Sequence, residues 1–395
     1  MRGIHLPGSI IPAQVAFVFL VLMSPCGFAQ APRPTPNDTL KSVNVGNDFR
    51  ITFRIYAPHA TVVKLGGTDI PEVLRKEAMT KNTNGVWEVS VGPVEPGAYR
   101  YDFIVDDVAV LDPRNPSVSE SNMNAWSLLY VPGSDVMDTR DVPHGAISEA
   151  TYYSSSLQRF RRLHIYTPPR YETGTDRYPV FYLLHGAFDT DDAWTSVGRA
   201  GLILDNLIAE KKAVPMIVIM PAGHTGPFSF NPSSGFRMDE FERDFINDIM
   251  PYTETHYRVF RDRGHRAIAG LSMGGAQTLD IGISRLADFS YIGVFSSGIF
   301  ELGARMSGPP PADSLTWEAR HIRSLSDNAL KRGLQSFWFA TGKEDFLLGV
   351  TRSTVDLFRR HGFDVAFKET SGGHTWINWR KYLVEFSQLL FRSGN

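Results

Sequence analysis

The chain has 395 residues, more than one hydrophobic core usually holds, so two folded units are expected. Its 43% hydrophobic and 21% charged residues are those of an ordinary soluble protein, and a net charge of -2 gives no electrostatic reason to expect a nucleic acid or an anionic membrane as a partner. The same balance argues against a substrate that is selected by its charge.

The first 29 residues have the pattern of a secretory signal peptide. Arg2 precedes an apolar core over residues 15–23, and small side chains stand before the expected cleavage point. The apolar core has about nine residues, whereas a helix that spans a membrane needs roughly 20. We therefore expect a secreted or periplasmic protein that keeps no membrane anchor after cleavage. Cys26, the only cysteine, lies in this segment, so the mature chain should have no disulfide and no cysteine-based metal site.

Residues 40–131 predict a small all-β sandwich. Stretches such as "FRITFRIYAP" and "GVWEVSVGPVEPGAYRYDFIVDD" alternate apolar and polar residues with a period of two, and Gly, Pro and Asn-Gly turn signals separate them. No residue of this region has a pattern that indicates catalysis.

The same region resembles the carbohydrate-binding domain that precedes the catalytic domain in glycogen-branching and debranching enzymes and in some bacterial esterases. The matching stretches are "TFRIYAPHATVVKL", "NGVWEVSVG", "PGAYRYDFIVDD" and "VLDPRNP". The resemblance implies an immunoglobulin-like sandwich that either binds sugar or acts only as a packing partner. The candidate sugar-stacking residues are Trp87, Tyr99, Tyr101 and Trp126, although alternation along strands should place at least half of them in the core.

Proline and glycine residues mark 132–150 as a linker, and residues 151–395 then alternate apolar strands with amphipathic helices. The expected strands are 161–168, 178–186, 215–223, 266–270, 291–297, 336–342 and 364–370, and the expected helices lie near 199–211, at 239–257, after residue 272, around 350–362 and from about 376. This order predicts an α/β fold with a doubly wound, mostly parallel sheet.

A nucleophile is indicated by "GLSMG", residues 270–274, which follows an expected strand and precedes an expected helix. Glycines two residues before and two after Ser272 would let the chain turn sharply without Cβ clashes, so that the hydroxyl projects above the sheet. The helix that follows adds a dipole favouring negative charge. Ser272 is therefore the candidate nucleophile.

A serine hydroxyl needs a base to take its proton and an acid to orient that base. Asp345 follows the strand "SFWFATG", and His374 lies in a glycine-rich loop after the next strand, so both fall at carboxyl ends of strands. The chain order Ser, Asp, His is that of α/β-hydrolases. Glu344, the neighbour of Asp345, is the alternative acid.

An oxyanion hole requires backbone N–H groups aimed at the developing charge. The residue after the nucleophile, Met273, should supply one N–H group. The loop after "YLLHG" should supply the other, from Ala187 or Phe188. His185 in the same stretch belongs to another part of the site.

The stretches "YPVFYLLHGAFDTDDAW", "AIAGLSMGGAQTL", "ATGKEDF" and "GGHTWINWR", with the lead-in "RFRRLHIYTPPRYE", are similar to the esterase D family of α/β-hydrolases. This family contains bacterial feruloyl esterases of the carbohydrate esterase family 1 type, acetyl xylan esterases, enterochelin esterases and mycolyltransferases. The resemblance spans about residues 143–395. It implies Ser272 as nucleophile, His374 as general base, Asp345 as its orienter, and an oxyanion hole formed by residues 186–188 with Met273.

Substrate contacts are expected from aromatic residues near the pocket. A Gly/Pro/Ser/Phe-rich insertion at residues 221–241 contains Phe228, Phe230 and Phe236, which could stack on an aromatic acyl group. Trp376 is a further candidate because it closely follows the base in the sequence, and Trp379 is a candidate for the same reason. Packing in the core is the alternative role for all of these rings.

These features predict a secreted serine carboxylesterase that removes hydroxycinnamoyl esters such as feruloyl from plant cell-wall polysaccharide such as arabinoxylan, without metal or organic cofactor. Acetyl xylan esterase is one alternative, and an enterochelin (siderophore) esterase is another, for which a more basic pocket is expected. A non-catalytic glycan-binding protein on a hydrolase scaffold is the alternative of a different class.

Overall fold

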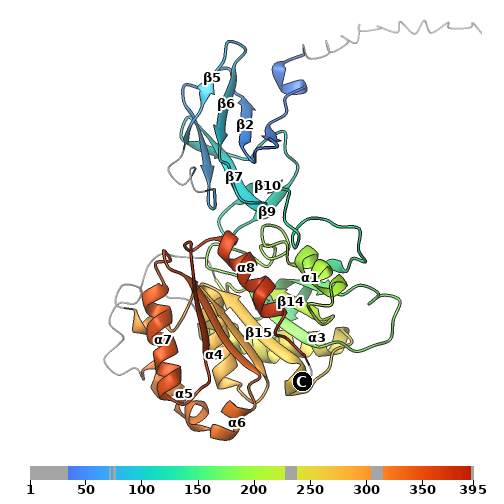
Figure 1. The fold of residues 1–395 in the computed structure, drawn as a ribbon, viewed down its shortest axis with the longest axis vertical. Coiled ribbons are helices and arrows are strands. Elements are labelled where there is room, and N and C mark those ends of the chain that lie inside the picture. Colours follow the sequence, from blue (N-terminus) through green and yellow to red (C-terminus); the bar gives the residue numbers. More distant parts are fainter. Residues whose placement is uncertain (1–33, 71–72, 74–76, 227–237, 304–314, 393–395) are drawn as a thin grey trace, which may run out of the picture.

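The computed structural model describes residues 34–392, apart from 71–72, 74–76, 227–237 and 304–314. The chain forms two units, a small all-β unit followed by a larger unit of strands and helices (Figure 1). The expected signal peptide, residues 1–29, lies outside the described residues. Among the residues that are described, no helix is both long enough and apolar enough to cross a membrane.

The first unit is the predicted β-sandwich. Its strands are β1 (Val43–Val45), β2 (Ile51–Tyr56), β3 (Val63–Gly67), β4 (Glu77–Ala78), β5 (Thr80–Lys81), β6 (Val86–Val91), β7 (Gly97–Val105), β8 (Val108–Val110), β9 (Val118–Glu120) and β10 (Ala125–Val131), after a short 3-10 turn, η1 (Pro36–Asp38). One antiparallel sheet has the order β1-β2-β6-β5, and the other has the order β4-β3-β7-β10-β9 with β8 paired to β7. Alternate side chains, among them Phe53, Leu65 and Phe103, form the buried core.

The predicted linker, residues 132–150, is shorter in the structure. Strand β11 (Ala146–Ser154) begins inside the predicted range and pairs along its whole length with β12 (Arg159–Thr167). The boundary was wrong because β11 lies at the edge of its sheet and its first residues are exposed, so its sequence lacks the buried apolar pattern that marks a central strand.

The second unit is built on an eight-stranded sheet. Its remaining strands are β13 (Val180–Leu184), β14 (Ile217–Pro221), β15 (Arg266–Leu271), β16 (Tyr291–Phe295), β17 (Ser336–Gly342) and β18 (Ala366–Thr370). The strand order is β11-β12-β14-β13-β15-β16-β17-β18, and β12 runs antiparallel to both of its neighbours whereas the pairs from β14 to β18 are parallel. The prediction of a mostly parallel sheet is confirmed.

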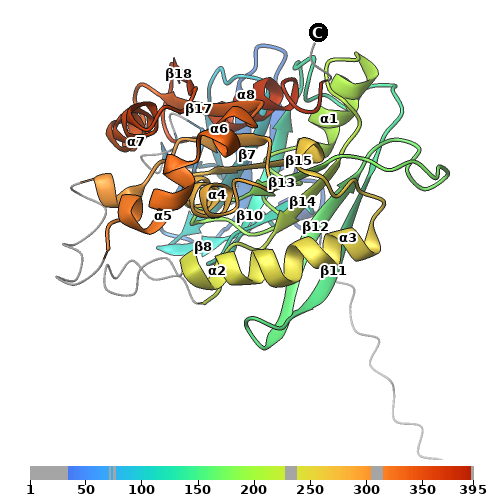
Figure 2. The same cartoon turned by 90° about the horizontal axis from the view of Figure 1, so that it is seen from below.

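Helices cover both faces of this sheet (Figure 2). They are α1 (Ala200–Ala209), α2 (Met238–Asp244), the π-helical segment η3 (Phe245–Ile249), α3 (Met250–His256), α4 (Met273–Ser284), α5 (Trp317–Ser326), α6 (Asn328–Arg332), α7 (Leu348–Arg360) and α8 (Trp376–Ser387), with 3-10 turns η4 (Arg263–His265) and η5 (Phe300–Leu302). Side chains of α1 and α8 share one core with one face of the sheet, and those of α2 to α5 and α7 share a second core with the other face. This is the doubly wound arrangement that the sequence predicts.

The two units are packed against each other through α8 (Figure 1). Arg380 of α8 is buried, and its Nη1 donates hydrogen bonds to the carbonyl of Ala98 in the sandwich, at 2.9 Å, and to that of Val197, at 3.1 Å. On the solvent side of the interface, Lys381 Nζ lies 2.8 Å from Glu95 Oε2. A buried guanidinium shared between the units indicates a fixed interface rather than a flexible tether.

Candidate active site

Ser272 occupies a sharp turn between β15 and α4. Its backbone has φ 52° and ψ -119°, a conformation that residues with a Cβ rarely adopt. The carbonyl of Ser272 accepts a 2.5 Å hydrogen bond from Ser297 Oγ, and its N–H donates to the carbonyl of Phe295 at 2.9 Å. The surrounding structure therefore holds the strained residue in place, as is typical of a nucleophile elbow.

Both glycines of the motif are required by close backbone approaches. A Cβ on Gly270 would lie 2.3 Å from the carbonyl oxygen of Gly274. A Cβ on Gly274 would lie 2.5 Å from the carbonyl oxygen of His185, at the end of β13. The first turn of α4 therefore packs directly on the strand ends, and only glycine fits at these positions.

Ser272, His374 and Asp345 form one hydrogen-bonded chain. Ser272 Oγ lies 3.0 Å from His374 Nε2, and His374 Nδ1 lies 3.0 Å and 3.1 Å from the two carboxylate oxygens of Asp345. The carboxylate favours the tautomer with a proton on Nδ1, which leaves Nε2 free to accept the serine proton. Glu344, the alternative acid, is exposed to solvent, whereas Asp345 is buried and contacts the histidine.

Asp345 is held in its charged form. Burial works to raise the pKa of its carboxyl, but the hydrogen bond and charge of His374, together with the N–H of Leu347 at 2.8 Å, outweigh it and lower the pKa below the ordinary value. Asp345 is therefore ionised at neutral pH and can stabilise a positive charge on the histidine.

The predicted oxyanion residues lie around Ser272. We call residues 186–189 the oxyanion loop; a Cβ on Gly186 would lie 3.5 Å from Ser272 Cβ, so the loop runs directly beside the serine. Ala187 is buried, and Phe188 is 53% exposed. Met273 is the first residue of α4, where helix N–H groups have no intrahelical acceptor. Met273 is thus adjacent to the nucleophile in the chain, and Ala187 and Phe188 directly follow the glycine that lies beside it.

His185 supports the oxyanion loop through hydrogen bonds of its buried ring. It is buried, its Nδ1–H donates to the carbonyl of Gly186 at 2.8 Å, and its Nε2 accepts the N–H of Gly223 at 2.7 Å. Burial lowers its pKa to about 4, so the ring is neutral at neutral pH and these two bonds fix one tautomer. His185 is thus a structural support of the loop, and its pattern "LLHG" marked it in the sequence.

Phe346 is a site residue that sequence reasoning missed. Its ring centroid lies 4.5 Å from that of His374, and the side chain is 68% exposed. Trp379 packs on His374 from another direction, edge-on at 4.9 Å. A large exposed apolar side chain beside the base has no partner that explains it as core. Its position directly after Asp345, in a loop at a strand end, was the available signal.

Several predicted ligand-contact residues are core residues. Trp376 is 2% exposed and packs edge-on against Trp194 at 5.0 Å, so the prediction that it stacks on substrate is wrong. Tyr101 is fully buried, with its hydroxyl donating to Asp112 at 2.6 Å, and Trp87 is buried with its Nε1 donating to the carbonyl of Ala57. Both sandwich rings stand at strand positions whose side chains face inward, so they pack in the core.

The remaining aromatic candidates have different outcomes. Trp126 on β10 is partly exposed and so keeps an accessible surface. Tyr99 is fully buried, like Tyr101. Phe228, Phe230 and Phe236 lie outside the described residues.

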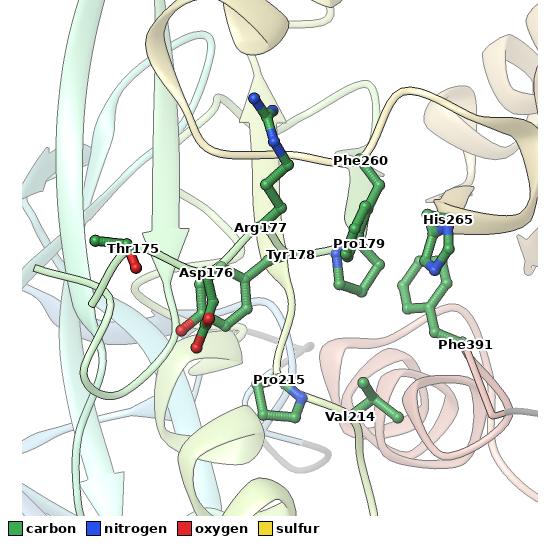
Figure 3. Close-up of a pocket in the computed structure, with 10 residues that line it drawn as sticks. All are labelled: Thr175, Asp176, Arg177, Tyr178, Pro179, Val214, Pro215, Phe260, His265 and Phe391. Atoms are coloured by element: carbon green, nitrogen blue, oxygen red, sulfur yellow. The ribbon is translucent and has the colours of Figure 1, made fainter.

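An open cavity of about 610 Å³ lies away from the triad (Figure 3). Tyr178 and Pro179, which precede β13, line it together with Phe260, His265 and Phe391. These residues lie at the amino ends of the parallel strands, whereas Ser272 lies at the carboxyl ends. In parallel sheets the ligand sites form at the carboxyl ends, so this cavity is not the predicted site.

Two family models match the chain. The esterase model, described as "Putative esterase", matches residues 154–390, and "Carbohydrate-binding module 48 (Isoamylase N-terminal domain)" matches residues 42–117. The first range contains the triad and the oxyanion loop, and the second covers most of the sandwich. Both matches confirm the resemblances that the sequence motifs indicated.

Curated relatives are similar in sequence. An "Endo-1,4-beta-xylanase/feruloyl esterase" of Xylanibacter ruminicola is 30% identical over 378 residues, which are 92% of this chain and 48% of the relative. The chain therefore spans about half the length of that relative. An "Acetyl esterase" of Caldicellulosiruptor saccharolyticus is 22% identical over 267 residues, 60% of this chain and 96% of the relative.

Solved structures have the same fold. A ferulic acid esterase is 26% identical, with a TM-score of 0.53 and coverage of 64% of this chain and 99% of that one. The enterochelin esterase of Shigella flexneri is 16% identical, with a TM-score of 0.58 over 88% of this chain and 94% of that one, and at this identity the likeness concerns the fold alone. Because the esterase model covers more than half of the chain and includes all three triad residues, the protein belongs to the esterase family of α/β-hydrolases.

Proposed function

We propose that this protein is a serine carboxylesterase that releases hydroxycinnamoyl groups, feruloyl above all, from plant cell-wall polysaccharide such as arabinoxylan. The observation that carries the proposal is the chain of contacts from Ser272 Oγ through His374 to the buried Asp345, at a strained turn beside the oxyanion loop. A glycan-binding protein on the same scaffold would have no need for this arrangement.

The reaction proceeds in two halves. Ser272 Oγ attacks the ester carbonyl carbon while its proton passes to His374 Nε2, and the carbonyl oxygen becomes an oxyanion that accepts hydrogen bonds from the N–H groups of Met273 and of Ala187 or Phe188. The intermediate collapses, and the sugar alcohol leaves with the proton from His374. Water then gives a proton to His374 and attacks the carbonyl carbon of the acyl-enzyme. The second intermediate collapses as His374 returns this proton to Ser272 Oγ, and the acid is released.

Exposed aromatic surface beside the triad supports an aromatic acyl group. The ring of Phe346 lies against His374, and the side chain of Phe188 in the oxyanion loop is exposed, so both offer apolar surface to a substrate. The feruloyl and ferulic acid esterases among the relatives support the same acyl class. An acetyl ester is the second candidate, favoured by the acetyl esterase relative.

The polysaccharide part of the proposal rests on the sandwich. Its match to a carbohydrate-binding module supports contact with sugar, and Trp126 is the remaining candidate with partly exposed surface. The apolar segment at residues 15–23 supports secretion or a periplasmic location, where such a polymer is met.

Release of ferulate from methyl ferulate and from feruloylated arabinoxylan, beside release of acetate from acetylated xylan, tests the function. Ser272→Ala is the control and should lower turnover by about 10⁶-fold if the triad acts as a unit, while a fluorophosphonate probe should label only the wild type. Acetate release alone would leave Ser272 as the nucleophile and exclude the aromatic acyl class. No release of either acid, with no labelling, would exclude the esterase.

A further inference from the structure

The oxyanion loop is held from outside the hydrolase unit. Arg100 of β7, in the sandwich, forms an ion pair with Asp189 at the end of this loop, with Nη1 and Oδ1 2.6 Å apart. The two side chains are only 3% and 5% exposed. The other guanidinium nitrogens donate to Ser119 Oγ at 3.0 Å and to the carbonyl of Glu120 at 2.9 Å. Both acceptors belong to the sandwich, so the sandwich fixes the orientation of the guanidinium toward Asp189.

The turn between β9 and β10, residues 121–124, makes a second contact with the same loop. Asn122 Nδ2 donates a 2.6 Å hydrogen bond to the carbonyl of Ala187, and the backbone N–H of Asn122 faces the carbonyl of Phe188 at 3.4 Å. A β-bridge joins Ser121 to Asp189 beside it. The sandwich thus bonds the residues that are proposed to supply the second oxyanion donor.

Because the peptide is planar, the hydrogen bond to the carbonyl of Ala187 also determines the direction of the N–H of Phe188. The carbonyl of Ala187 and the N–H of Phe188 belong to one rigid plane and point in opposite directions. A donor that fixes the carbonyl on the sandwich side therefore fixes the direction of the N–H on the other side. The same bond polarises the peptide and makes its N–H a stronger donor. His185 plays the equivalent part for the preceding peptide, since it bonds the carbonyl of Gly186.

The sandwich also contacts the loop that carries the base. The carboxylate of Asp69 is buried and accepts the N–H of Trp376 at 2.9 Å, two residues after His374. Asn378 Nδ2 holds the same loop from within the hydrolase unit, through the carbonyl of Gly373 at 3.0 Å. Two separate loops of the site are therefore anchored in the first unit.

We propose that the sandwich is a positioning element of the active site, in which Asn122 sets the Ala187–Phe188 peptide plane for oxyanion binding and Arg100 holds the loop through Asp189. This inference rests on the proposed esterase function, and it assigns the first unit a part in catalysis on small esters that carry no sugar. Asn122 and Arg100 are positioning residues, since they act through the loop.

Asn122→Ala and the isosteric Asn122→Asp test the proposal on methyl ferulate. The aspartate cannot donate to Ala187 and would place an oxygen against its carbonyl. We expect kcat to fall about 10- to 100-fold in both variants with KM unchanged, because the loss is of transition-state stabilisation. The matched control is Lys381→Met, which removes the exposed ion pair with Glu95 across the same interface and should leave kcat at the wild-type value.

A transition-state mimic separates positioning from general damage. With an aryl trifluoromethyl ketone, Ser272 Oγ adds to the carbonyl carbon, its proton goes to His374, and the ketone oxygen becomes a hemiketal oxyanion in the hole. The inhibition constant should rise in the Asn122 variants by the same factor as kcat falls, while inhibition by ferulate, the product, stays unchanged. Wild-type kcat and ketone affinity in both variants would overturn the inference, as would equal weakening of ketone and product binding.

Arg100→Lys adds a conservative change that keeps the charge but removes the fork of donors, and its kcat should fall while its KM does not. Failure of this variant to fold leaves the Asn122 pair as the decisive measurement. A wild type that does not hydrolyse methyl ferulate contradicts the proposed function. A wild type that is active and depends on Ser272, beside fully active Asn122 variants, contradicts only the present inference.

Discussion

At the scale of single residues, the site depends on which groups are charged and which are neutral. Asp345 is buried and ionised, whereas His185 is buried and neutral. The charge on Asp345 follows from its partners, the ring of His374 and the N–H of Leu347, whereas burial keeps the ring of His185 neutral. Each state has a measurable pH dependence.

Asp345→Asn should lower kcat by about 10⁴-fold, because the amide no longer selects the reactive tautomer of His374. The folded pKa of Asp345 is depressed, so its ionised form stabilises the native state above the unfolded pKa of about 4, and this contribution is lost as pH falls through the folded pKa. The difference in melting temperature between wild type and variant should therefore shrink from pH 7 to pH 3. A constant difference would contradict the assigned charge.

His185 should make the protein less stable in mild acid. An unfolded histidine binds a proton near pH 6.5, whereas the folded ring, with a pKa of about 4, does not, so stability falls as pH drops from about 6.5 to 4. Fully developed, this amounts to about 3 kcal/mol. Urea unfolding at pH 7 and pH 5 should show a smaller loss for His185→Gln than for wild type. An equal loss in both proteins would assign the effect to other groups.

Sequence reasoning could find the triad at this scale because Ser272, Asp345 and His374 each stand at the end of a strand in a known chain order. Phe346 was missed although it directly follows Asp345, since a phenylalanine in a loop is as consistent with core packing as with exposure. Trp376 was assigned to the substrate because it is close to His374 in the sequence. That closeness does not determine which side of α8 the ring faces.

At the scale of elements, the turn from β15 into α4 tolerates no added side chain. Gly270→Ala should place a methyl group against the backbone of Gly274, destabilise the protein by about 1–3 kcal/mol and abolish turnover, because the serine would move from the base. Gly349→Ala, at the start of α7, is the control: nothing lies within 4 Å of its added Cβ, and alanine should raise stability by up to about 1 kcal/mol. Thermal unfolding and methyl ferulate hydrolysis of both variants check the contrast.

The elements themselves were largely predictable. Central strands such as β13, β14 and β15 are buried on both faces, so their sequences are continuous apolar runs that stand out from their surroundings. Strand β11 escaped detection because an edge strand with exposed residues shows neither a continuous apolar run nor a clear alternation. Whether a strand could be predicted therefore depended on the burial of its side chains and not on its strand propensity.

At the scale of the whole molecule, we expect the hydrolase unit to depend on the sandwich. A chain that begins at residue 132 would leave Asp189 without its ion pair to Arg100, so the oxyanion loop would lose its anchor in the sandwich. It would also remove Ala98, whose carbonyl bonds the buried Arg380. We expect this truncated chain to be insoluble, or to lack activity even on methyl ferulate. Full activity on methyl ferulate with loss only on arabinoxylan would instead describe a sandwich that serves sugar binding alone.

The interface could not be predicted from the sequence. Arg100 and Asp189 are 89 positions apart, and Asn122 and Ala187 are 65 apart, in segments that each look complete by themselves. Local patterns report which face of an element is buried, but they do not report the partner that buries it.

The bonds from Asn122 and Arg100 to the oxyanion loop limit how such proteins can be recombined. Exchange of the sandwich for another sugar-binding module would remove Asn122 and Arg100. We expect this exchange to lower the activity of the hydrolase unit even if both units folded. A successful graft has to carry these two side chains, or a replacement for each, with the catalytic half.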